Sequence, residues 1–150
     1  MIEFPTIRSG LAYVVDNLVS HGLGYIVNIE RIDTRHQLIQ VVAQGMIEFN
    51  NENGLSVHLP FDIDSGQHKY LLRFFELDLS VEVKQQDFGN IPCFYANFGT
   101  DYEYANRVIL LLLVQLYKCS PSEKFMCEVY DEGPLDRVET HQAPPGGVIV

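Results

Sequence analysis

The sequence predicts an α+β fold in which an antiparallel β-sheet of about five to six strands packs against an N-terminal helix and a long C-terminal helix. Three observations lead to this prediction. Apolar residues recur at helical spacing near both ends of the chain, they alternate with polar residues over most of the middle, and turn-forming residues separate the alternating segments. We expect a single domain over residues 1–133, followed by a polar Pro/Gly tail over residues 134–150.

The first helix is predicted over residues 7–21. Thr6 is available as its N-cap, and Gly22 can end the helix after His21. The apolar positions with helical spacing are Ile7, Leu11, Val14, Val15 and Leu18.

Alternating segments then predict an antiparallel meander. Residues 25–30 and 38–43 form a hairpin around a polar turn at residues 33–35. The Asn53-Gly54 pair is a strong hairpin signal, and it separates residues 47–49 from a strand over residues 55–59.

The middle of the chain predicts a short helix that opens near Ser65 and includes Phe74 and Phe75. Residues 77–83 alternate without a break, which indicates a half-buried strand with an acidic outer face. Residues 85–92 are expected to turn, and residues 93–98 to form the next strand.

A capping box at Thr100-Asp101-Tyr102-Glu103 predicts the start of the long helix, with the Thr100 hydroxyl accepting from the backbone of Glu103. The face expected to lie on the sheet carries Tyr102, Ala105, Val108, Ile109, Leu112, Leu113 and Leu116. A last strand is expected over residues 125–130.

The opposite side of this helix is also apolar in its middle. It carries Tyr104, Leu110, Leu111 and Val114. A surface helix is usually polar there, so either the chain's own tail or a further strand covers these residues, or another chain does, as in a homodimer. We treat them as candidate partner-binding residues.

Charge and composition exclude several classes of partner. The chain carries 10 Lys+Arg against 20 Asp+Glu, a net charge of -10, and no basic cluster that would attract nucleic acid or anionic lipid. The longest apolar run, residues 108–114, is too short for a membrane span. The N-terminus has no secretory signal, and Cys93, Cys119 and Cys127 fit reduced thiols, so we expect a cytoplasmic protein.

No nucleophile elbow, P-loop or dinucleotide fingerprint is present, so we predict neither an enzyme nor a cofactor. The clustered metal-capable residues are His58, Asp62, Asp64 and His68, whose spacing matches no zinc or calcium motif. They are weak candidates for a metal site. The alternative is that an aspartate caps the following helix and both histidines are solvated.

Acidic residues Glu76, Asp78 and Glu82 share one face of the strand predicted over residues 77–83 or lie beside it. They could attract a basic partner by raising the encounter rate, or they could form only a solvated sheet face. We include them among the candidate partner-binding residues.

The order of elements over residues 6–130 resembles the type III secretion chaperone-like fold, a small α/β sandwich. The capping box at Thr100–Glu103 and the helix over residues 105–116 are compatible with it, whereas the strand over 125–130 and the tail depart from its pattern. Such chaperones are short, acidic and usually dimeric. The resemblance implies a non-enzymatic binding module that holds an extended segment of another protein.

Three hypotheses for function follow. The first is a small chaperone-like or adaptor protein, homodimeric, that holds a segment of a basic or partly unfolded partner protein. The second is an immunity-type inhibitor whose acidic face binds a basic toxin or nuclease. The third is a metal-dependent enzyme built on the loop from His58 to His68.

Overall fold

The computed structural model describes residues 1–21, 23–44, 54–60, 82–88 and 91–134, and it confirms the α+β class. The strands are β1 (Ile2–Phe4), β2 (Leu23–Arg31), β3 (Gln37–Gln44), β4 (Gly54–Pro60), β5 (Glu82–Phe88), β6 (Ile91–Gly99) and β7 (Phe125–Pro134). The helices are α1 (Ile7–His21) and α3 (Tyr102–Gln115).

One antiparallel sheet holds all seven described strands, in the order β1-β7-β2-β3-β4-β6-β5. The last described strand therefore lies beside β2, where Val27 of β2 pairs with Val129 of β7 on one side and with Val41 of β3 on the other. The predicted meander is confirmed for β2, β3 and β4. Strands β2 to β7 agree with the predicted number, and β1 was not predicted, because it has only three residues and shows no alternation to recognise.

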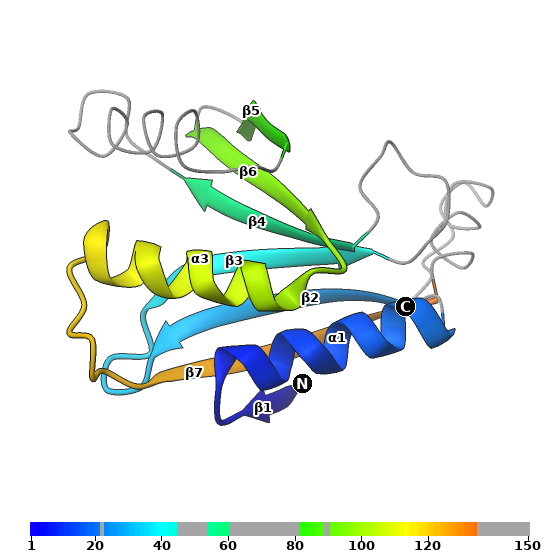
Figure 1. Cartoon of the computed structure of the whole chain (residues 1–150), viewed down its shortest axis with the longest axis horizontal. Coiled ribbons are helices and arrows are strands. Elements are labelled where there is room, and N and C mark those ends of the chain that lie inside the picture. Colours follow the sequence, from blue (N-terminus) through cyan, green and yellow to red (C-terminus); the bar gives the residue numbers. More distant parts are fainter. Residues whose placement is uncertain (22, 45–53, 61–81, 89–90, 135–150) are drawn as a thin grey trace, which may run out of the picture.

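Both described helices cover the same face of the sheet, so the described part of the chain forms two layers (Figure 1). Residues that point from the sheet toward the helices form the core, among them Val27, Val41, Val57 and Val129, each at most 1% exposed. The other face of the sheet alternates with these positions and is more polar.

Helix α1 begins and is capped as predicted, since Thr6 Oγ1 accepts a hydrogen bond of 3.1 Å from the backbone N–H of Ser9. Gly10 lies against Cys127 of β7 so closely that an added Cβ would collide with the Cys127 sulfur. This glycine lets α1 approach the sheet.

Helix α3 differs from its prediction at the start and in its length. The N-cap is Asp101, whose carboxylate accepts from the backbone N–H of Tyr104 at 3.0 Å, and the capping box on Thr100 is wrong. Aspartate is a stronger N-cap than threonine, and Glu103 is instead paired with Arg8 of α1. With 14 residues against 15 in α1, α3 is not the long helix that was expected.

Two boundaries of strands also differ from the prediction. Residues 85–88, expected to turn, continue β5, and Phe88 pairs with Ile91 at the start of β6. Residues 85–88 have low β-propensity, so the sequence pattern did not predict that they form a strand. They are extended because they pair with β6. Strand β7 runs on to Pro134, past the predicted end at residue 130.

Some expectations lie outside the described residues. These are the strand over residues 47–49, the short helix near Ser65, residues 77–81 of the acidic strand, and the tail from residue 135. Within the described ranges, no helix is both long and apolar enough to cross a bilayer.

Candidate functional site

A groove of about 530 Å³ opens where the start of α1, the middle of α3 and the segment before β7 meet. Ile7, Leu110 and Phe125 supply much of its apolar surface, and Ile7 and Phe125 are themselves buried in the core. The other lining residues are Pro5, Thr6, Arg8, Asn106, Glu123 and Lys124. The volume falls within the range of sites that bind small molecules or anchor side chains of a partner.

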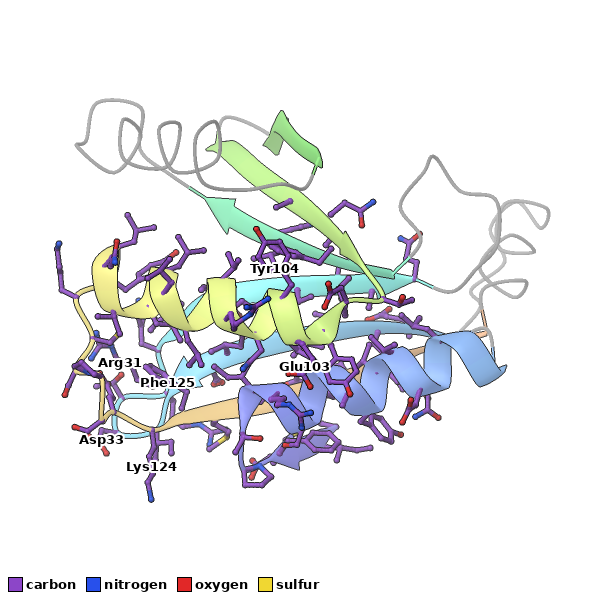
Figure 2. The ribbon with its side chains drawn as sticks, in the orientation of Figure 1. Arg31, Asp33, Glu103, Tyr104, Lys124 and Phe125 are labelled. Atoms are coloured by element: carbon purple, nitrogen blue, oxygen red, sulfur yellow. The ribbon has the colours of Figure 1, made fainter. Side chains whose placement is uncertain are left out.

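Arg31, at the end of β2, fixes the wall that precedes β7. Its Nη1 lies 2.9 Å from Glu123 Oε1, and its Nη2 donates to Cys119 Sγ at 3.1 Å. Figure 2 shows Arg31 beside Phe125 and Lys124 at this end of the molecule. The connection between α3 and β7 is therefore held to the sheet, and the groove is formed before any ligand arrives.

The opposite wall is tied across the two helices. Arg8 of α1 pairs with Glu103 in the first turn of α3, and its Nε lies 2.9 Å from Glu103 Oε1. This pairing lowers the pKa of Glu103, chiefly through the hydrogen bond from Arg8. Because both side chains are exposed, the ion pair adds little stability, and it joins the two helices beside the groove.

The exposed side of α3 continues from the groove. Leu110 is 43% exposed and Leu111 is 39% exposed, and Val114, one turn later in the helix, is half-buried. Arg107 lies one turn earlier on the same side. We call Arg107, Leu110, Leu111 and Val114 the α3 surface.

Tyr104, the fourth predicted residue on this side, has a structural contact. Its ring packs against Phe98 of β6 at a centroid distance of 5.5 Å, and the Arg107 guanidinium lies 5.4 Å from the ring centroid. Figure 2 shows Tyr104 on the side of α3 opposite to Glu103. The Tyr104 ring therefore contacts both Phe98 and the Arg107 guanidinium.

Cationic side chains lie beside these apolar residues, although the net charge of the chain is -10. Arg107 lies on the α3 surface, Lys124 lines the groove, and Lys118 follows the end of α3. Within the described part of the chain, neither Lys118 nor Lys124 makes an ion pair. Arg107 and Lys124 therefore place positive charge beside the apolar residues, against the sign of the whole molecule.

The other residues predicted for a site are only partly described. His58 lies in β4 and is half-buried, and burial lowers the pKa of its imidazole. Asp62, Asp64, His68, Glu76 and Asp78 lie outside the described residues, and of Glu82 only the backbone at the start of β5 is described. Over the described ranges, no group of three or more His, Cys, Asp or Glu is placed to hold a metal ion.

The described cysteines lie in the core. Cys119 and Cys127 are both free and buried, and burial raises the pKa of each thiol, that of Cys127 to about 12. A thiol in this state is a poor nucleophile at neutral pH. The side chain of Cys93 lies outside the description.

Sequence reasoning missed a pair of buried glutamates on the sheet face that points away from the helices. Glu30 of β2 and Glu128 of β7 have side chains that are 10% and 4% exposed. Burial and the neighbouring Glu128 carboxylate raise the pKa of Glu30. Each residue alternates with apolar ones in its strand, so each looked like an ordinary outward-facing position, and only the pairing of β2 with β7 brings them together.

Comparisons with protein-family models, with curated proteins and with solved structures found no match to this chain. The resemblance to the type III secretion chaperone-like fold therefore stays a prediction. Any function has to be argued from the surfaces of the molecule itself.

Proposed function

We propose that the protein is a protein-binding module that holds an apolar segment of another protein on the α3 surface and in the adjoining groove. The observation that carries this proposal is the exposure of two successive leucines, Leu110 and Leu111, beside a groove with an apolar floor. Single exposed leucines are normal, but adjoining apolar side chains and a concave apolar surface are typical of docking sites.

Burial of these leucines supplies a driving force for binding. Covering a leucine fully is worth roughly 1.5–3 kcal/mol, and Leu110 and Leu111 are each about 40% exposed. Two such side chains, together with the groove floor at Ile7 and Phe125, provide anchor positions for a short segment. The walls are held by Arg31 and Arg8, so little ordering is needed when the segment binds.

The charges around the surface indicate the chemistry of the partner. Arg107 lies on the α3 surface and Lys124 lines the groove, whereas the chain as a whole is acidic. The complementary segment has apolar anchors with acidic flanks. Free thiols at Cys119 and Cys127 suit a reducing compartment, and the proposed place of action is the cytoplasm.

Selection of random displayed peptides on the immobilised protein tests the proposal. Peptides with apolar anchors and flanking Asp or Glu should be enriched. Leu111→Asp should weaken their binding by at least about tenfold, equivalent to about 1.4 kcal/mol. Lys124→Glu should weaken acidic peptides and leave neutral ones nearly unchanged.

Ile32→Asp is the matched control, because Ile32 is 45% exposed and does not line the groove. It introduces the same charge at an equally exposed apolar position. Equal effects of Leu111→Asp and Ile32→Asp would contradict the proposal. The alternative is that a second copy of this chain covers the α3 surface. Light scattering of the free protein tests it, since a homodimer that Leu111→Asp dissociates would assign the surface to that second copy.

A further inference from the structure

Three glutamates from three neighbouring strands meet on the sheet face that points away from the helices. Glu3 of β1 pairs in register with Glu128 of β7, and Glu30 of β2 lies across from Met126, two positions along β7. Glu30 and Glu128 are each buried by nine-tenths or more. Carboxylates are rarely buried to this extent unless cations and hydrogen-bond donors compensate them.

A single described cation compensates this cluster. Arg35, in the connection between β2 and β3, places Nη2 2.6 Å from Glu128 Oε1, Nε 3.9 Å from Glu30 Oε2 and Nη1 4.0 Å from Glu3 Oε1. Three carboxylates therefore share one guanidinium within the described part of the chain. Arg35 is half-exposed and has a left-handed backbone conformation, with φ of 57°.

The two buried carboxylates differ in the number of hydrogen bonds that their oxygens accept. Glu128 accepts from Arg35 with one oxygen and from the Tyr130 hydroxyl, at 2.8 Å, with the other. Glu30 Oε2 is buried and accepts no hydrogen bond from the residues described. A buried oxygen without a donor costs free energy, which a ligand that donates to it would recover.

The surroundings of this oxygen favour a planar cation. The local charge is negative even with Arg35 in place, so an added cation is attracted. Tyr130, which is 37% exposed and lies on the same face, offers an aromatic side chain beside the carboxylates. Guanidinium groups stack on such rings and donate to carboxylates through a rigid fork, which an ammonium cannot do.

We infer that Glu30, Glu128 and Tyr130 form a binding site for an arginine side chain of a protein partner, which enters beside Arg35 and donates to Glu30 Oε2. This site lies on the face opposite to the α3 surface, so it is independent of the proposed function. The protein would then carry two recognition surfaces of opposite character.

Binding at this site is coupled to a proton. The groups placed around Glu30 are Glu3 on β1, Glu128 and Tyr130 on β7, and Arg35 on the connection between β2 and β3. Since the pKa of Glu30 is raised in the free protein, an incoming cation that favours the ionised carboxylate releases the proton. Affinity therefore rises with pH through the range between the ordinary pKa of a glutamate and the raised one.

Titration calorimetry with a triarginine peptide tests the inference, with trilysine and tricitrulline as control peptides. Triarginine should bind more tightly than trilysine, and the neutral tricitrulline should not bind. Glu30→Gln should weaken triarginine by about tenfold or more and abolish the proton release that is measured between two buffers of different ionisation enthalpy. Glu132→Gln, the same charge change at an exposed position of β7, is the matched control and should change affinity less than about twofold.

Equal effects of Glu30→Gln and Glu132→Gln, or equal affinity for triarginine and trilysine, would overturn the inference. Either result would mean that cations are attracted only by the diffuse negative charge of the whole protein. Circular dichroism of Glu30→Gln checks that the variant is folded. A folded variant with undiminished affinity for triarginine would also overturn the inference.

Discussion

At the scale of single residues, Glu30 is the side chain whose surroundings suit its charge least. Burial and Glu128 raise its pKa, and the attraction of Arg35 opposes them without reversing the direction. The folded protein therefore holds a proton on Glu30 at pH values at which the unfolded chain has released it. The consequence is a loss of stability as pH rises above the ordinary pKa of a glutamate, about 4.3, toward the raised one.

Glu30→Gln should remove this loss, because an amide has no proton to release in that range. We expect its midpoint of thermal unfolding to exceed that of the wild type at neutral pH, and the difference to shrink toward zero near pH 4. Thermal denaturation across this range measures both values. A variant that is less stable than the wild type at neutral pH would contradict this expectation. It would show that the surrounding residues stabilise the ionised Glu30 carboxylate in the folded protein.

At the scale of elements, α1 makes one especially close contact with the sheet. Gly10 faces Cys127 with no room for a methyl group between them, and both residues are buried. Neither residue is distinguished by the sequence pattern, since the glycine looks like a poor helix former and the cysteine like core filler. Their contact depends on β7 lying beneath α1.

Gly10→Ala should lower the free energy of unfolding by roughly 1–3 kcal/mol, because the added methyl group overpacks the contact. In a Cys127→Ala background the same change should cost much less, since the sulfur that it meets is gone. A double-mutant cycle by urea denaturation measures the coupling. Equal costs in both backgrounds would mean that the helix moves away without loss.

The start of α3 allows a second test at this scale. Asp101→Ala should cost about 1 kcal/mol because it removes the acceptor for the backbone of Tyr104. Thr100→Ala should change stability by less than about 0.5 kcal/mol. The denaturant midpoints of the two variants compare these losses directly. A larger loss for Thr100→Ala than for Asp101→Ala would indicate that Thr100 caps the helix, as the sequence predicted.

At the scale of the whole molecule, the sequence predicted which segments form helices and strands better than it predicted which strands lie side by side. Helix α1, the hairpin of β2 and β3, and the buried face of α3 follow from periodicity, and the structure confirms them. The place of β7 between β1 and β2 could not be predicted, because pairing between the ends of a chain leaves no local pattern.

The same distinction applies to the surfaces. The exposure of Leu110 and Leu111 follows from a helical wheel, because it is a property of one element. The groove needs three elements that are far apart in the sequence, and the glutamate pair needs two. The periodicity of a single segment cannot reveal such sites.

The central claim is that the α3 surface holds a segment of another protein. A photo-activated cross-linking residue placed at position 111 in the cell, and at position 32 as the equally exposed control, tests it most directly. We expect a discrete adduct of this chain with a second protein from position 111, lost on Lys124→Glu, and none from position 32. Adducts of equal yield from both positions, or an adduct with the mass of two copies of this chain, would contradict the claim.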